Sequence, residues 1–102
     1  MTDTFDYLAE AERLLAGAEQ DAAQARPAAE SALKALLVTW GVTPRGESVV
    51  ALLDQAAETD DTLLHFRAEA AVLDRVDPSA QPDAADRAKI FVDAARARLA
   101  NI

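Results

Sequence analysis

Apolar residues recur at intervals of three and four in five successive stretches of the chain, which is the period of an α-helix. The clearest stretch lies before Gly41, and glycine commonly terminates helices. Its apolar positions are Ala25, Ala29, Ala32, Leu33, Leu36, Leu37 and Trp40. Because each apolar stripe must be sheltered from water by another helix, the pattern predicts an all-α fold.

The side chains available for a core are mostly small. Alanine supplies much of the 51% hydrophobic content, and the 102 residues include only three Phe, one Trp and one Tyr. Alanine is the strongest helix former, so propensity favours helix throughout, and a core of small side chains requires helices that approach closely. A chain of this size buries roughly 65% of its unfolded surface. We therefore expect one core, in a single domain spanning residues 1–102.

Interruptions of the apolar pattern predict four or five helices. Gly17 and Pro27 bracket the first interruption, where the chain either turns or kinks. The later interruptions are rich in Gly, Pro, Asp or Thr and lie at residues 42–46, 59–61 and 77–82. Because these connections are short, we expect a single antiparallel helical bundle of four to five helices.

The fourth predicted helix, over residues 62–76, carries apolar residues around more than one face. Such a helix is either buried on two sides or contributes to a dimer interface. On the second interpretation Leu64 and Phe66 are the candidate interface residues, and the protein is a homodimer.

The net charge of −8 and the isoelectric point near 4.4 oppose generic DNA binding, which depends on free Lys and Arg. The absence of cysteine excludes disulfides and thiolate chemistry. The first residues carry acid where a signal peptide carries base, and no apolar run approaches the length of a membrane span. We therefore expect a cytoplasmic protein without a membrane segment.

Catalytic and metal-binding patterns are absent from the sequence. His65 is the only histidine, so no metal-binding His pair can form within the chain, and no His-Glu pattern accompanies it. The three glycines are isolated, and no phosphate-binding loop is present. We expect no metal, no cofactor and no catalytic residue of a familiar type.

Four charged residues stand beside apolar stripes and form the candidate ligand site. Glu30 and Lys34 flank the leucines of the second predicted helix, and Arg67 and Arg75 interrupt the fourth. They either form ordinary surface salt bridges or line a polar cleft that holds a small anionic ligand through guanidinium groups.

Residues 28–37 read Ala-Ala-Glu-Ser-Ala-Leu-Lys-Ala-Leu-Leu, and Gly41, Pro44 and the Val-Ala-Leu-Leu run at 50–53 follow them. This arrangement resembles the core signature of HEPN domains, small helical bundles with an "A-A-E-K-A-L-K-A-L-L" helix. The match departs at Ser31, where the family commonly has Lys. Residues 7–15 and 85–92 resemble the first and last helices of the family, so the resemblance covers nearly the whole chain.

The resemblance implies a bundle that often dimerises. Family members are metal-independent endoribonucleases or non-catalytic modules that bind nucleotides, RNA or a nucleotidyltransferase partner. The ribonucleases carry an Arg followed by His after four to six intervening residues. Arg75 stands at the Arg position, but Ala80, Gln81 and Pro82 occupy the His positions.

We therefore predict a non-catalytic HEPN-like binding or partner module that forms a homodimer. Its ligand is a nucleotide or another small anion, RNA, or a nucleotidyltransferase-type protein. Two alternatives stay open at this point. The chain could be a divergent metal-independent endoribonuclease of a toxin–antitoxin system, or a purely structural helical dimerisation domain.

Overall fold

A computed structural model describes residues 4–75 and 83–100, and the side chains of Thr4 and Arg75 lie outside that description. Its elements are α1 (Thr4–Ala18), the 3₁₀ helix η1 (Ala22–Gln24), α2 (Ala25–Thr39), α3 (Val49–Ala57), the 3₁₀ helix η2 (Asp61–Phe66), α4 (Arg67–Arg75) and α5 (Ala84–Leu99). Within those residues there is no strand, and five α-helices are present. The predicted all-α fold is confirmed. None of the described helices is both long and apolar enough to cross a membrane.

The first interruption is a turn rather than a kink. The carbonyl of Gly17 accepts hydrogen bonds from the N–H groups of Gln20 and Asp21, which closes α1. The side chain of Asp21 then caps η1, and α2 begins at Ala25, the residue directly after η1. Pro27 is the third residue of α2, where its missing N–H removes no hydrogen bond of the helix.

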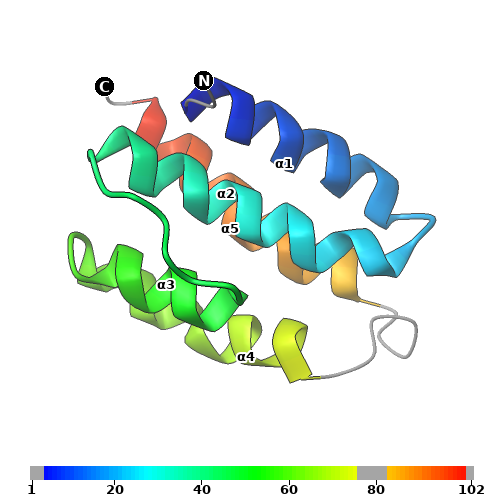
Figure 1. Cartoon of the computed structure of the whole chain (residues 1–102). Coiled ribbons are helices and arrows are strands. Elements are labelled where there is room, and N and C mark those ends of the chain that lie inside the picture. Colours follow the sequence, from blue (N-terminus) through cyan, green and yellow to red (C-terminus); the bar gives the residue numbers. More distant parts are fainter. Residues whose placement is uncertain (1–3, 76–82, 101–102) are drawn as a thin grey trace.

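Helix α2 is the centre of the structure, with α1 along one side and α5 behind it (Figure 1). Five alanines of α2 are completely buried, which lets its neighbours approach closely. They are Ala25, Ala28, Ala29, Ala32 and Ala35. Leu33, Leu36 and Leu37 complete the buried surface of α2, and Phe91 of α5 is the largest fully buried side chain.

The helical pairs α1–α2 and α3–α4 run antiparallel, as expected for short connections (Figure 1). Helices α2 and α3 instead run in the same direction, because the segment over residues 40–48 leads the chain back along the bundle before α3 begins. This segment and α3 lie beside α2 at the surface of the molecule.

The fourth predicted helix is two elements, η2 followed by α4. A 3₁₀ helix has three residues per turn, so residues three apart share a face. Leu63 is accordingly buried, and Phe66 packs edge-on against Phe91 with ring centroids 6.2 Å apart. Leu64 lies between them and is 49% exposed. The wide apolar stripe therefore reflects a change of helical period within the segment.

Candidate functional site

The segment after α2 begins with a defined helix end. Gly41 has φ +75°, a left-handed conformation that glycine adopts without strain. The Gly41 N–H donates to the Val38 carbonyl, and the Val42 N–H donates to the Leu37 carbonyl at 2.8 Å. This pair of bonds is a Schellman motif, and Val42 packs on the core. The direction in which the chain leaves α2 is thereby fixed.

The side chain of Gln55 holds the next part of the segment against α3. Its Nε2 donates to the Thr43 carbonyl at 2.8 Å, and its Oε1 accepts from the Arg45 N–H at 3.1 Å. Gln55 is only 8% exposed and is the one buried polar side chain recorded in the described residues. Gly46 then lies so close to α3 that a Cβ there would be 2.8 Å from the Leu52 nitrogen. Residues 43–46 are therefore fixed in place.

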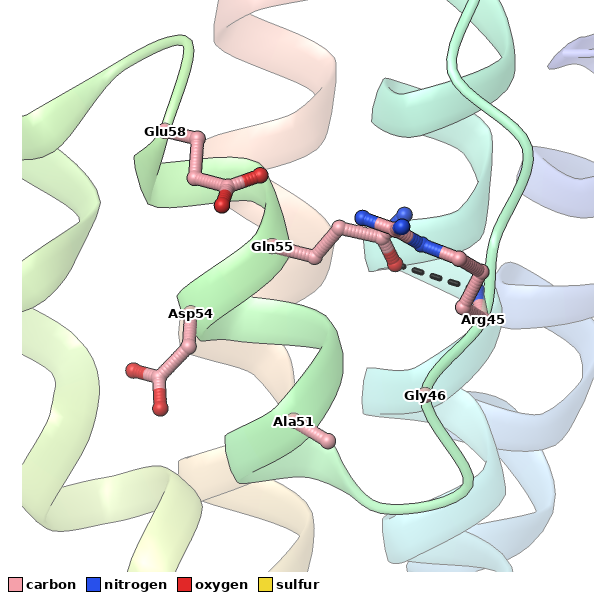
Figure 2. A pocket seen from close by; sticks show the side chains of 6 residues that line it. All are labelled: Arg45, Gly46, Ala51, Asp54, Gln55 and Glu58. Atoms are coloured by element: carbon pink, nitrogen blue, oxygen red, sulfur yellow. Dashed lines mark hydrogen bonds between the residues drawn. The ribbon is translucent and has the colours of Figure 1, made fainter.

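An open groove of about 300 Å³ lies between this segment and α3. It is lined by Arg45, Gly46, Ala51, Asp54, Gln55 and Glu58 (Figure 2). The side chain of Arg45 extends from the segment towards α3, and Glu58 lies across the opening at the end of that helix. The groove therefore has the guanidinium of Arg45 on one side and the carboxylate of Glu58 on the other, whereas Asp54 points away from Arg45.

Asp54 is already paired outside the groove. Its two carboxylate oxygens accept from Nε and Nη2 of Arg67 at 3.0 and 3.2 Å. The hydrogen bonds that Arg67 donates to Asp54 raise the pKa of Arg67 above its ordinary value. Arg67, one of the four predicted ligand residues, thus links α4 to α3.

Glu30 and Lys34 both lie on α2, and the ion-pair partner of Glu30 is Arg26. Arg26, one turn earlier, places its Nε 3.4 Å from Glu30 Oε1 and 3.3 Å from Asp74 Oδ1. No ion pair between Glu30 and Lys34 is recorded among the described residues. Burial raises the pKa of Glu30, and the nearby Asp74 adds to this effect, whereas Arg26 and Lys34 counteract it.

Asp74 joins this cluster to the start of α3. Its Oδ1 and Oδ2 accept from the N–H groups of Val49 and Val50 at 3.0 and 2.8 Å. Ser48 accepts a third N–H of the same helix end, that of Ala51. The Arg26–Glu30–Asp74 cluster therefore serves to hold α2, α3 and α4 together.

Glu30 and Lys34 thus share helix α2 without an ion pair between them in the described residues. Glu30 pairs with Arg26, and Arg67 pairs with Asp54. Arg75 ends α4, but its side chain lies outside the described part of the structure. The positions expected to hold a ribonuclease histidine, Ala80, Gln81 and Pro82, also lie outside it.

His65 is exposed on η2. Across the described residues, no group of His, Asp and Glu side chains is arranged to hold a metal ion. The chemistry that the described side chains offer at the groove is charge pairing and hydrogen bonding from Arg45 and Glu58, because the amide of Gln55 is already bonded to Thr43 and Arg45.

Sequence reasoning missed the role of Gln55, although a signal for it exists. Gln55 follows Leu52 by three residues and precedes Ala56, so it lies on the apolar face of α3. An amide on a buried helical face needs hydrogen-bond partners. The adjoining Pro- and Gly-containing segment was the nearest source of backbone partners.

Comparisons of the chain with protein-family models, with curated proteins and with solved structures found no match.

Proposed function

We propose that the chain is a non-catalytic, HEPN-like partner module and that the partner it binds is a protein rather than a nucleic acid. The observation that carries this proposal is the internal pairing of its basic side chains. A surface that binds phosphates needs Lys and Arg free to replace counterions. A module with few such groups is suited to a protein partner.

Carboxylates of the same chain hold most of the basic residues. The residues in these ion pairs are Arg13, Arg26, Arg67, Arg87, Lys89, Arg96 and Arg98. Acidic residues also outnumber basic ones, 18 to 10. A polyanion approaching this surface would have to displace existing ion pairs against a net repulsion.

The resemblance to HEPN domains supports a non-catalytic role, because Ala80, Gln81 and Pro82 replace the histidine of the ribonuclease motif. None of these side chains can exchange a proton with a 2′-hydroxyl group. A nucleotidyltransferase-type protein is the partner class that the resemblance implies.

Binding and cleavage assays test the choice between protein and nucleic acid. We expect labelled single-stranded and hairpin RNA to show no binding by fluorescence anisotropy at low salt and no cleavage, and nucleotides to leave the melting temperature unchanged. We also expect a tagged chain, purified from cells that produce it naturally, to retain a protein in fixed stoichiometry. RNA binding that weakens with salt, or cleavage abolished by Arg75→Ala, would overturn the proposal.

A second function, homodimerisation, is favoured by the exposed Leu64 on η2. Light scattering of Leu64→Glu tests it, with His65→Glu as the control because His65 is the exposed neighbouring residue. A dimeric wild type that becomes monomeric only in Leu64→Glu supports an interface there. Phe66→Glu is unsuitable as a test of the interface, because Phe66 packs against Phe91 and its loss would disturb the core.

A further inference from the structure

Arg45 and Glu58 are the charged groups of the groove that have no intramolecular partner in the described residues. No ion pair in the described part of the chain includes either side chain, whereas Asp54 is held by Arg67. Both side chains are exposed. In a chain that pairs most of its cations internally, the unpaired guanidinium of Arg45 is an exception.

Glu58 occupies a position where a negative charge is electrostatically unfavourable. It follows the last residue of α3 as the C-cap, and its backbone N–H donates to carbonyls of that helix. The C-terminal end of a helix carries partial negative charge, so a carboxylate there is unfavourable and a cation is favoured. Glu58 thus gains more from an external cation than a carboxylate elsewhere on the surface does.

The backbone that carries Arg45 is held before any partner arrives. Gln55 bonds the segment on both sides of Pro44, Gly46 lies against α3, and the Schellman motif fixes the start at Gly41. A partner binding here orders little of this backbone, which reduces the entropic cost of association. Arginine in such a setting is a frequent anchor of protein interfaces.

The charges also define what the groove accepts. An occupant must offer an acceptor to Arg45 and a cation to Glu58, whereas the carboxylate of Asp54 is already paired with Arg67. A phosphate group placed on Arg45 would lie near the unpaired carboxylate of Glu58 and is disfavoured. The volume of about 300 Å³ is at the lower end of small-molecule sites, which suits a pair of side chains.

We propose that this groove docks a segment of a partner protein that places an Asp or Glu on Arg45 and a Lys or Arg on Glu58. The proposal rests on the proposed function, because it presumes a protein partner, and it identifies the surface and the charge pattern of that partner.

Selection from a phage-displayed library of random short peptides on the immobilised full chain tests the docking pattern. Counter-selection uses the double variant Arg45→Glu/Glu58→Arg, which keeps the net charge and alters exposed side chains only. The matched control is Lys89→Glu/Asp93→Lys, which reverses an exposed ion pair on α5 away from the groove. Circular dichroism and melting temperature establish that each variant folds.

We expect enriched peptides to carry an acidic and a basic residue at a constant spacing. Their affinity, measured by fluorescence anisotropy, should fall about tenfold or more in Arg45→Glu and in Glu58→Arg. The control variant should bind them as the wild type does. Raised salt should weaken binding, because exposed charge pairs are screened.

Three results would overturn the proposal: no enriched peptide, peptides without the paired charges, or peptides that bind the double variant equally well. A dimeric wild type that the double variant converts to a monomer would also overturn it, by showing that a second copy occupies the groove. If a natural protein still co-purifies with the double variant, the proposed function stands and the groove is not its site. If groove-binding peptides are found but no natural protein partner exists, the proposed function fails, whereas the docking pattern proposed for the groove stands.

Discussion

Individual carboxylates in this protein have opposite effects on its pH dependence, and Glu30 is the clearest case. Burial raises its pKa above the ordinary 4.5. Between 4.5 and the raised value the folded chain binds more protons than the unfolded chain, so stability decreases as the pH rises. We expect Glu30→Gln to increase the free energy of unfolding at neutral pH, with the gain shrinking as the pH falls towards 4.5. Urea unfolding over this range measures it.

Asp60 provides the control of opposite sign. The Thr62 hydroxyl donates to its carboxylate at 2.5 Å and Arg98 Nε at 2.7 Å, and these bonds lower its pKa below the ordinary 3.8. The resulting stability is present above 3.8 and is lost as the pH falls through the lowered pKa. Asp60→Asn should therefore be less stable than the wild type at neutral pH. Equal pH profiles for both variants would contradict this account.

At the scale of elements, the start of α3 depends on a side chain from α4. Asp74 accepts two N–H groups of α3, those of Val49 and Val50. Backbone N–H groups without a hydrogen-bond acceptor at a helix start cost free energy, so Asp74→Ala should lower the free energy of unfolding by about 1–2 kcal/mol. Urea denaturation followed by circular dichroism measures the change.

Ser48→Ala and Asp93→Ala are the controls for this prediction. Ser48 caps the same helix through one N–H, so its loss should cost less than the loss of Asp74. Asp93 forms only exposed ion pairs on α5, which contribute little. An effect of Asp74→Ala no larger than that of Asp93→Ala would show that the capping is energetically unimportant.

The whole molecule is organised around close approach to α2. Ala32 is completely buried there, so Ala32→Leu adds three carbon atoms where neighbouring helices leave no space. Overpacking of this kind typically costs about 1–3 kcal/mol. We expect Ala32→Leu to lower the free energy of unfolding by this amount, as measured by urea denaturation. The control is Ala68→Leu, at an exposed position of α4, which should leave the free energy of unfolding nearly unchanged. If Ala32→Leu also left it unchanged, the alanine core would be loosely packed.

The sequence by itself determined the all-α fold and most of the helices with their ends, but not the division of the fourth predicted helix into η2 and α4. These features are local, because a stripe such as Leu33, Leu36 and Leu37 needs only the helical period, and Gly41 needs only its own freedom of φ. The interruption over residues 42–46 was likewise expected from its Pro and Gly content.

Only the tertiary structure decided which helical faces meet and which charges pair. Alanine–leucine stripes resemble one another and admit many pairings of similar energy, and each polar contact adds only about 1 kcal/mol. The attachment of Asp74 to α3, of Arg67 to Asp54 and of Gln55 to the segment before α3 could not be predicted from the sequence for that reason. The groove that leaves Arg45 and Glu58 unpaired follows from those long-range choices.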